Sequence, residues 1–393
     1  MKRIASILTL FASVALSVGS ALAAGEPIKI GVPTSQTGPY AVLGEQVIKA
    51  VEFAAAEANA AGGVDGRKVE IKIGDTMGIP DAGRRAGEKL SNEGYKILIG
   101  SISSAVGLAL STQLDRWDAM YVSVVNKSDK LTGDSCKPRM FRANHSDDMD
   151  IAIVLPWLKD QKEKNWSIIV ADYVWGRGSA AAFKAAAQKV GKTVKLELFA
   201  PLGTTDYAPY ISQLRESGSQ GLWVALSGSD AVNFAKQAKQ FGLTDKMLVF
   251  GHNFVVSSTV KAVGKDAIGV WGNVNYAASI KTPQNKKFVE AWRAKFNADP
   301  TEYEGEAYTG MQMIFAAVKM AKSVAAGDVS KALNGLKAST PFGDLTMRAA
   351  DHQLEMPNYL GKVVDKDGVT TIEVVRGFDA TEATPPPSAL CKL

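Results

Sequence analysis

The sequence has few of the residues on which most enzymes and metal sites depend. Only three histidines occur among its 393 residues, and they lie far apart, at positions 145, 252 and 352. The sequence contains no G-x-S-x-G nucleophile elbow, no G-x-x-x-x-G-K-[ST] phosphate loop and no H-E-x-x-H zinc motif. We therefore expect no catalysis and no metal or other cofactor. A secreted α/β enzyme that uses a polar cleft is the less favoured alternative.

A large imbalance of charge is also missing. The chain carries 45 Lys and Arg against 40 Asp and Glu, a formal net charge of +5, and residues of both signs are interleaved along it. No helix face shows the concentrated positive charge that is typical of nucleic-acid-binding proteins. We therefore expect no nucleic acid among its partners.

Long apolar runs are confined to the beginning of the chain. Met1 to Arg3 is a basic start, Ile4 to Val18 is mostly apolar, and Ala21-Leu22-Ala23 is a small-x-small cleavage site. This three-part design predicts a secretory signal peptide over residues 1–23, because the apolar run is too short to span a bilayer. No cysteine follows the cleavage site, so we expect export without a lipid anchor.

The two cysteines, Cys136 and Cys391, have no partner at a spacing suited to redox or metal chemistry. In an exported protein an even pair predicts one disulfide. This bridge would tie the C-terminal tail, which follows the stiff run Pro385-Pro386-Pro387, to the middle of the chain. Two unpaired thiols are the alternative.

The chain alternates short apolar strands with helical segments, which predicts an α/β fold of parallel sheets with helices on both faces. We expect the strands near residues 28–32, 68–73, 95–100, 121–125, 166–171, 193–199, 221–226, 247–251 and 269–275. Further helices and a β-rich portion over residues 342–376 complete the chain. Because this length exceeds one ordinary core, we expect two domains.

Polar loops follow several of these strands. The first strand leads into Ser35–Tyr40, and a helix follows directly. This order places hydroxyls and free backbone N–H groups at the carboxyl edge of a sheet, where α/β proteins bind small ligands and helix N-termini favour anions. Similar loops lie at residues 101–104, 126–127, 173–175, 227–230 and 252–254. Together they are typical of a cleft for a small ligand with a polar head and an apolar body, with a set of ordinary βα turns as the alternative.

Within these loops, Ser103 and Ser104 suit a carboxylate, because hydroxyls and helix-start N–H groups meet there. Tyr40, Tyr173 and Trp175 could stack on an apolar ligand body. The alternatives are a simple N-cap role for Ser104 and ordinary packing for each aromatic ring.

Short segments spread over nearly the whole chain match one known family. They are Ile28-Lys29-Ile30-Gly31 with Thr37-Gly38-Pro39, Glu57 to Val64 with Gly66, Gly74-Asp75 with Pro80, Ile99-Gly100 with the serines after it, Trp175-Gly176-Arg177-Gly178, and Lys236-Gln237-Ala238 with Gly242-Leu243. In these segments the chain resembles the leucine/isoleucine/valine-binding protein family, the type I periplasmic solute receptors of ABC importers.

The resemblance implies a two-lobed clamp, with each lobe a parallel-sheet α/β sandwich and three crossover strands between them. It implies lobe 1 over residues 26–142 plus 276–340 and lobe 2 over residues 143–275 plus 341–393. It also implies a monomeric periplasmic receptor that passes an amino acid or a related small carboxylate to an ABC permease at the inner membrane. A ligand sensor with the same clamp, feeding a signalling partner, is the alternative.

The resemblance also assigns roles to candidate site residues. Ser103 and Ser104 would grip the ligand carboxylate, and Trp175 would close over the ligand from the other lobe. Val125 and Lys127 would add contacts at the next strand end. The remaining candidates are Tyr40, Tyr173, Ser229, Asp230 and Asn253.

The sequence departs from the amino-acid-binding members of the family at two positions. Asn253 stands where those members hold the ligand's α-ammonium with an acidic residue, and Lys127 brings a cation where a small hydroxyl residue is usual. An ammonium buried beside Lys127 without a carboxylate would be unfavourable by several kcal/mol. We therefore expect a carboxylate ligand without an α-amine, with an aromatic acid favoured. The alternatives are Asp230 as a substitute acid and Lys127 as an exposed rim residue.

Overall fold

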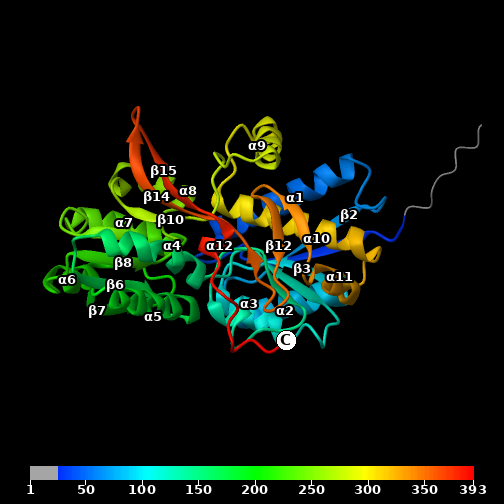
Figure 1. Cartoon of the computed structure of the whole chain (residues 1–393), viewed down its shortest axis with the longest axis horizontal. Coiled ribbons are helices and arrows are strands. Elements are labelled where there is room, and N and C mark those ends of the chain that lie inside the picture. The colour runs from blue at the N-terminus through cyan, green and yellow to red at the C-terminus, as the bar shows by residue number, and fades with distance from the viewer. Residues whose placement is uncertain (1–24) are drawn as a thin grey trace, which may run out of the picture.

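The computed structural model describes residues 25–393 and places them in two lobes that lie side by side (Figure 1). The predicted signal peptide falls on residues that the structure does not describe. Within residues 25–393, no helix is both long and apolar enough to cross a bilayer.

The first lobe is built around a parallel sheet with the strand order β2-β1-β3-β4-β5. Its strands are β1 (Ile28–Thr34), β2 (Val69–Asp75), β3 (Ile97–Gly100), β4 (Met120–Ser123) and β5 (Met140–Arg142). The apolar alternation in β1 buries Ile28, Ile30 and Val32 completely. Helices α1, α9, α10 and α11 pack on one face of the sheet, and α2 and α3 pack on the other.

The helices of this lobe come from two parts of the chain. They are α1 (Ala41–Ala60), α2 (Pro80–Asn92), α3 (Ser104–Ser111), α9 (Pro283–Phe296), α10 (Glu302–Ala321) and α11 (Ala326–Leu333), with a short 3₁₀ turn η1 (Asp129–Thr132). The chain therefore enters the first lobe, leaves it and returns.

The second lobe is built around a seven-stranded sheet with the order β15-β14-β10-β9-β8-β6-β7. Its strands are β6 (Asn165–Ala171), β7 (Thr193–Ala200), β8 (Gly221–Ala225), β9 (Leu248–Gly251), β10 (Trp271–Val274), β14 (Asn358–Lys366) and β15 (Val369–Phe378). The strands β6 to β10 run parallel, and β14 and β15 are added antiparallel.

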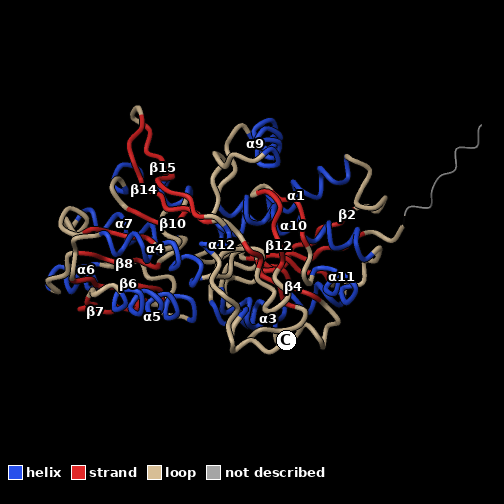
Figure 2. Tube along the Cα trace, viewed as in Figure 1, coloured by secondary structure: helices blue, strands red, loops and turns tan. Residues whose placement is uncertain are grey.

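Helices cover both faces of this second sheet. They are α4 (Asp147–Asp160), α5 (Val174–Lys189), α6 (Ala208–Glu216), α7 (Ser229–Gln240), α8 (Ser257–Val263) and α12 (Ala380–Ala383), with the 3₁₀ turn η2 (Gly264–Ala267). Helices α4, α5 and α12 pack on one face, and α6, α7 and α8 pack on the other. Figure 2 shows the strands inside each lobe with the helices around them, apart from the β14–β15 hairpin, whose tip projects beyond the helices. This is the α/β architecture that the sequence predicts.

A small antiparallel sheet changes one expected boundary. It consists of β11 (Lys337–Thr340), β12 (Gly343–Met347) and β13 (Leu354–Glu355). Leu345, Met347 and Leu354 are buried in the core of the first lobe, although residues 341–356 are expected in lobe 2. The third crossover therefore lies near residue 357 rather than at 340/341, because these apolar side chains need the first lobe to cover them.

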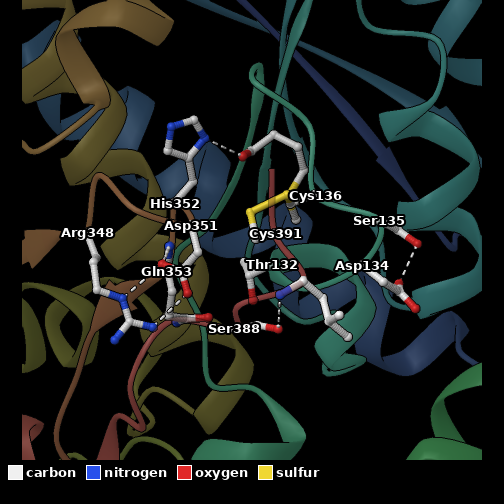
Figure 3. The surroundings of a disulfide bond; sticks show 12 residues. Thr132, Asp134, Ser135, Cys136, Arg348, Asp351, His352, Gln353, Ser388 and Cys391 are labelled. Carbon is white, nitrogen blue, oxygen red and sulfur yellow. Dashed lines mark hydrogen bonds and ion pairs between the residues drawn. A yellow bond between two sulfur atoms is a disulfide. The ribbon is translucent and has the colours of Figure 1, made fainter. Parts of the chain in front are cut away.

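Three segments connect the lobes: β5 to α4, β10 to α9, and β13 to β14. The predicted disulfide is also present, between Cys136 and Cys391, whose Cα atoms lie 5.5 Å apart (Figure 3). It fastens the C-terminal tail to the loop before β5.

Candidate functional site

A narrow cavity with a volume of about 10 Å³ lies between the two lobes. Its lining from the first lobe consists of Tyr40, Ile102, Ser104, Val125, Lys127 and Tyr303, and that from the second lobe consists of Tyr173, Trp175, Ser227 and Asn253. All of these residues except Tyr303 come from loops or helix starts that follow parallel strands. The cavity is therefore at the carboxyl ends of both sheets, where the sequence predicts a ligand.

Ser104 forms the polar end of the cavity in the first lobe. It is the first residue of α3, and its Oγ accepts the backbone N–H groups of Lys127 and Ser128, each at 3.2 Å. Because Oγ already accepts two hydrogen bonds, its own O–H remains to donate to a ligand. The neighbouring Ser103 is buried as the N-cap residue of α3 and does not line the cavity.

Lys127 lines the cavity but is not an exposed rim residue, because its side chain is only 2% exposed. Its Nζ lies 3.0 Å from the Asp150 carboxylate and donates to Asn275 Oδ1 at 2.6 Å. Burial by itself would raise the pKa of Asp150, but the charge of Lys127 and the hydrogen bond from His252 outweigh it and hold the pKa well below its usual range. The alternative of Lys127 as an exposed rim residue is therefore wrong, and Asp150, 23 residues along the chain, balances its charge.

Aromatic residues from both lobes form the walls of the cavity. The Tyr40 hydroxyl donates to the Tyr173 hydroxyl at 2.9 Å, which links the two lobes directly. The Tyr173 and Trp175 ring centroids lie 6.0 Å apart, and Trp175 Nε1 donates to Asp147 Oδ1 at 3.0 Å. Burial raises the pKa of Tyr40 and of Tyr173, so both hydroxyls are neutral.

Two candidates in the second lobe lie outside the lining. Ser229 faces the first lobe through its backbone, because its N–H donates to the Pro39 carbonyl at 3.1 Å. The carboxylate of Asp230 accepts the Gly203 N–H at 3.0 Å, and burial raises its pKa. Both residues begin α7, and Asp230 is engaged by the neighbouring loop, so it does not reach the cavity as a substitute acid.

Asn253 lines the cavity from a left-handed backbone conformation, with φ of 53°. Its N–H donates to Asn273 Oδ1 at 3.1 Å, which fixes this turn after β9. An amide therefore stands where an acidic residue would be needed for an ammonium. Among the residues that the structure describes, no Asp or Glu lines the cavity.

Three lining residues are missed by the sequence analysis. Ile102 and Ser227 belong to two of the polar loops that the sequence analysis names. In those loops it predicts only neighbouring residues as ligand contacts. Tyr303 lies in the first turn of α10, after no strand. Its only local signal is the capping box of Thr301 and Glu304. This motif marks a helix N-terminus, but it does not tell which way the Tyr303 side chain points.

The comparisons with known proteins agree with this fold. A family model described as "Periplasmic binding protein" matches residues 27–368. The Leu/Ile/Val-binding protein homolog 8 of Brucella suis is 30% identical over 338 residues, which cover 82% of this chain and 84% of that protein.

Solved structures share the fold. A solute-binding protein of an ABC transporter from R. palustris, in complex with benzoate, has a TM-score of 0.84 at 20% identity, over 93% of this chain and all of that one. An amino acid ABC transporter substrate-binding protein from Pseudomonas fluorescens Pf-5 has a TM-score of 0.81 at 22% identity, over 94% of this chain and 99% of that one. At these identities the likeness shows the fold alone.

Proposed function

The chain belongs to the periplasmic binding protein family, as its resemblance predicts, and we propose that it is the receptor of an ABC importer for a small carboxylic acid. The family consists of solute-binding proteins and not of enzymes. The periplasmic location and the delivery of the ligand to a membrane permease are part of this proposal, and family membership supports both.

The lining of the inter-lobe cavity carries the proposed ligand class. Its polar groups are hydroxyls, one amide and the ammonium of Lys127, which Asp150 already neutralises. A ligand ammonium enclosed here would meet no carboxylate, and burying an unpaired charge is costly. We therefore favour an acid without an α-amine over an amino acid.

The carboxylate of this acid would bind at the start of α3. The free O–H of Ser104 and the N–H groups of the first helical turn are donors, and the positive end of the helix dipole favours an anion. Charge-assisted hydrogen bonds of this kind are stronger than neutral ones. No free cation is needed, which fits the pairing of Lys127 with Asp150.

The body of the acid would lie between aromatic walls, so an aromatic ring is the sharper proposal. Tyr40, Tyr173, Trp175 and Tyr303 supply ring faces and edges, and stacked or edge-on aromatic contacts add to the burial of apolar area. Solved members with benzoate and with 3,4-dihydroxybenzoic acid bound share the fold.

Capture would proceed by closure of the lobes around the acid. The Tyr40–Tyr173 hydrogen bond and the contact of Ser229 with Pro39 join the lobes in this structure, so they describe the closed arrangement. Closure removes water from the cavity and strengthens the hydrogen bonds to the carboxylate.

The test is a thermal-shift and calorimetric comparison of acids that differ only in the α-amine. The pairs are 3-phenylpropionate against phenylalanine and 4-methylpentanoate against leucine, with benzoate and 4-hydroxybenzoate added. A tight ligand at about 100 times its Kd stabilises the folded protein by about 2.7 kcal/mol, which shifts Tm by several degrees.

We expect the amine-free acid of each pair to give the larger shift and the aromatic pair to exceed the aliphatic one. A shift with leucine or phenylalanine but not with their amine-free partners would contradict the proposed ligand class while leaving the receptor role in place. No shift with any small solute would contradict the receptor role itself.

A further inference from the structure

One buried carboxylate receives hydrogen bonds from both lobes. Asp150 lies in the first turn of α4 and is 0% exposed. Its Oδ2 accepts from Lys127 Nζ and from His252 Nε2, both at 3.0 Å. Its Oδ1 accepts from the side-chain amides of Asn275 and Asn358, both at 2.8 Å. We call these five residues the Asp150 network.

The network joins all three connections between the lobes. Asp150 follows the first connection, Asn275 begins the second, and Asn358 ends the third. The two asparagines also bond to each other, from Asn275 Nδ2 to Asn358 Oδ1 at 3.1 Å. One side chain therefore fixes the relative positions of three segments that are far apart in sequence.

The network also reaches both walls of the cavity. Lys127 lines the cavity from the first lobe, and His252 directly precedes the lining residue Asn253 in the second. His252 is the Nε2–H tautomer, because the Asp150 carboxylate beside Nε2 can only accept and burial lowers the pKa of His252. Ser179 Oγ accepts from Trp223 Nε1 at 3.0 Å and lies 2.7 Å from His252 Nδ1. Ser179 then donates to Nδ1, which leaves Nε2–H to donate to Asp150.

We propose that Asp150 is a positioning residue that holds the three connections and both cavity walls in the closed arrangement. It touches no ligand itself and acts through Lys127 and through the His252–Asn253 turn. The proposal deepens the receptor function and rests on it, but it concerns lobe closure and can be tested without a ligand.

The experiment measures the distance between the two edges of the cleft, one on each lobe, by pulsed electron paramagnetic resonance. We call this the lip-to-lip distance. Spin labels are placed by Gln36→Cys in the first lobe and Thr205→Cys in the second. Both residues are exposed, and they flank the contact of Pro39 with Ser229. The native cysteines are joined and do not react. Distances are recorded without ligand and with benzoate, in the wild type and in Asp150→Asn.

In the wild type, the short-distance population represents the closed protein and the long-distance population the open one. We expect Asp150→Asn to lower the ratio of short to long distances at least about tenfold, in each condition in which the wild type shows short distances. The Kd for any acid that binds would then rise by a similar factor. Asp148→Asn is the matched control, because it removes a carboxylate from the same turn but outside the network. It should leave the distribution unchanged.

Asn358→Ala separates positioning from simple charge burial and remains informative if Asp150→Asn does not fold. It keeps the Lys127–Asp150 pair and removes only the link to the third connection, so a partial loss of the short-distance population is expected. An unchanged distribution in Asn358→Ala, or in Asp150→Asn, would overturn the proposal. So would a wild type that shows only long distances in both conditions. Absence of binding by benzoate would count against the ligand class alone.

The C-terminal tail carries a second, independent inference. Ala383 of α12 is buried in the second lobe, and Arg348 Nη1 of the first lobe donates to the Pro385 carbonyl at 2.7 Å. The tail then reaches Cys391, which is bonded to Cys136 in the first lobe, and Figure 3 shows Ser388 and Cys391 beside Thr132 and Cys136. The tail therefore passes from one lobe to the other.

We infer that this tail is a fourth, covalently closed connection that limits how far the lobes open. The same labelled protein tests it in two variants: Cys136→Ser combined with Cys391→Ser, and Cys136→Ser in a chain that ends at Thr384. Both changes should extend the longest lip-to-lip distances in the ligand-free protein by the same amount. Distances equal to those of the wild type in both variants, measured well below Tm, would overturn the inference.

Discussion

The inter-lobe cavity and the hinge beside it are both buried and polar, but they differ in charge. The cavity is lined by hydroxyls, an amide and aromatic rings, and the charge of its one lining cation, Lys127, is neutralised by Asp150 outside the lining. The hinge, formed by the five residues of the Asp150 network, holds the ion pair of Asp150 with Lys127. The difference indicates that the buried charge fixes the lobes, whereas the cavity presents mainly neutral groups, which lose less on desolvation.

The largest expected effect comes from breaking the charge pair of the hinge. Asp150→Ala leaves the buried Lys127 ammonium without a counter-charge, and loss of one partner of a buried pair costs about 3–5 kcal/mol. Urea unfolding should show this loss, and Lys127→Met added to Asp150→Ala should recover part of it. The control Asp148→Ala should cost less than about 1 kcal/mol. A similar small loss in Asp150→Ala would mean that the hinge charges are solvated.

The next effect tests the cleft without touching the hinge. Gly228 has φ of 62°, and an added Cβ would collide with the Pro39 carbonyl oxygen of the other lobe. We expect Gly228→Ala to weaken binding of the best acid in calorimetry by about tenfold or more, because only the open state relieves the collision.

Gly218→Ala is the matched control for this effect. Gly218 has φ of 67° and no neighbour within 4 Å of the added Cβ, so it reproduces the backbone strain of about 1–3 kcal/mol without the collision. Equal affinities in the two variants would show that Gly228 does not meet Pro39 in the bound state.

Glu302, an ionisable group between the lobes, should make the stability of the protein depend on pH. Glu302 of the first lobe accepts from Ser257 N and Oγ of the second, both at 3.0 Å, and burial raises its pKa to about 7. The unfolded pKa is about 4.3, so the folded protein binds the proton more tightly. The free energy of unfolding should therefore rise as pH falls from about 7 towards 5, by at most about 1.4 kcal/mol per unit.

The measurement compares the wild type with Glu302→Gln across this pH range. Asp129, whose pKa burial and Asp148 raise to about 6, contributes in the same direction, so the difference between the two proteins isolates Glu302. The variant should show the shallower slope. Parallel pH profiles would mean that Glu302 is solvated in the folded protein.

The smallest effect removes one neutral contact of the cleft. Tyr40→Phe deletes the hydrogen bond to Tyr173 between the lobes, and a neutral bond contributes about 0.5–1.5 kcal/mol. Calorimetry should show affinity weaker by a few-fold, with little change in Tm. A loss as large as that in Gly228→Ala would make Tyr40 a main ligand contact rather than a link between the lobes.

Much of the fold and part of the candidate site follow from local patterns. The strand–helix alternation predicts the two α/β lobes, and the polar loops after the strands contain most of the cavity lining. The choice of residues inside each loop does not follow, since Ser227 lines the cavity and Ser229 does not. Which side chain of a turn faces a cavity depends on what packs behind it.

The sequence by itself determined the family and the fold class and predicted the pairing of Cys136 with Cys391, because each rests on short motifs, periodicity or a count. Only the tertiary structure decided that Lys127 is neutralised by Asp150, that Tyr303 lines the cavity and that residues 341–356 pack in the first lobe. These features depend on segments that meet only after the chain has crossed between the lobes. No local pattern records such a meeting, so the charge balance around the cavity became visible only in the folded protein.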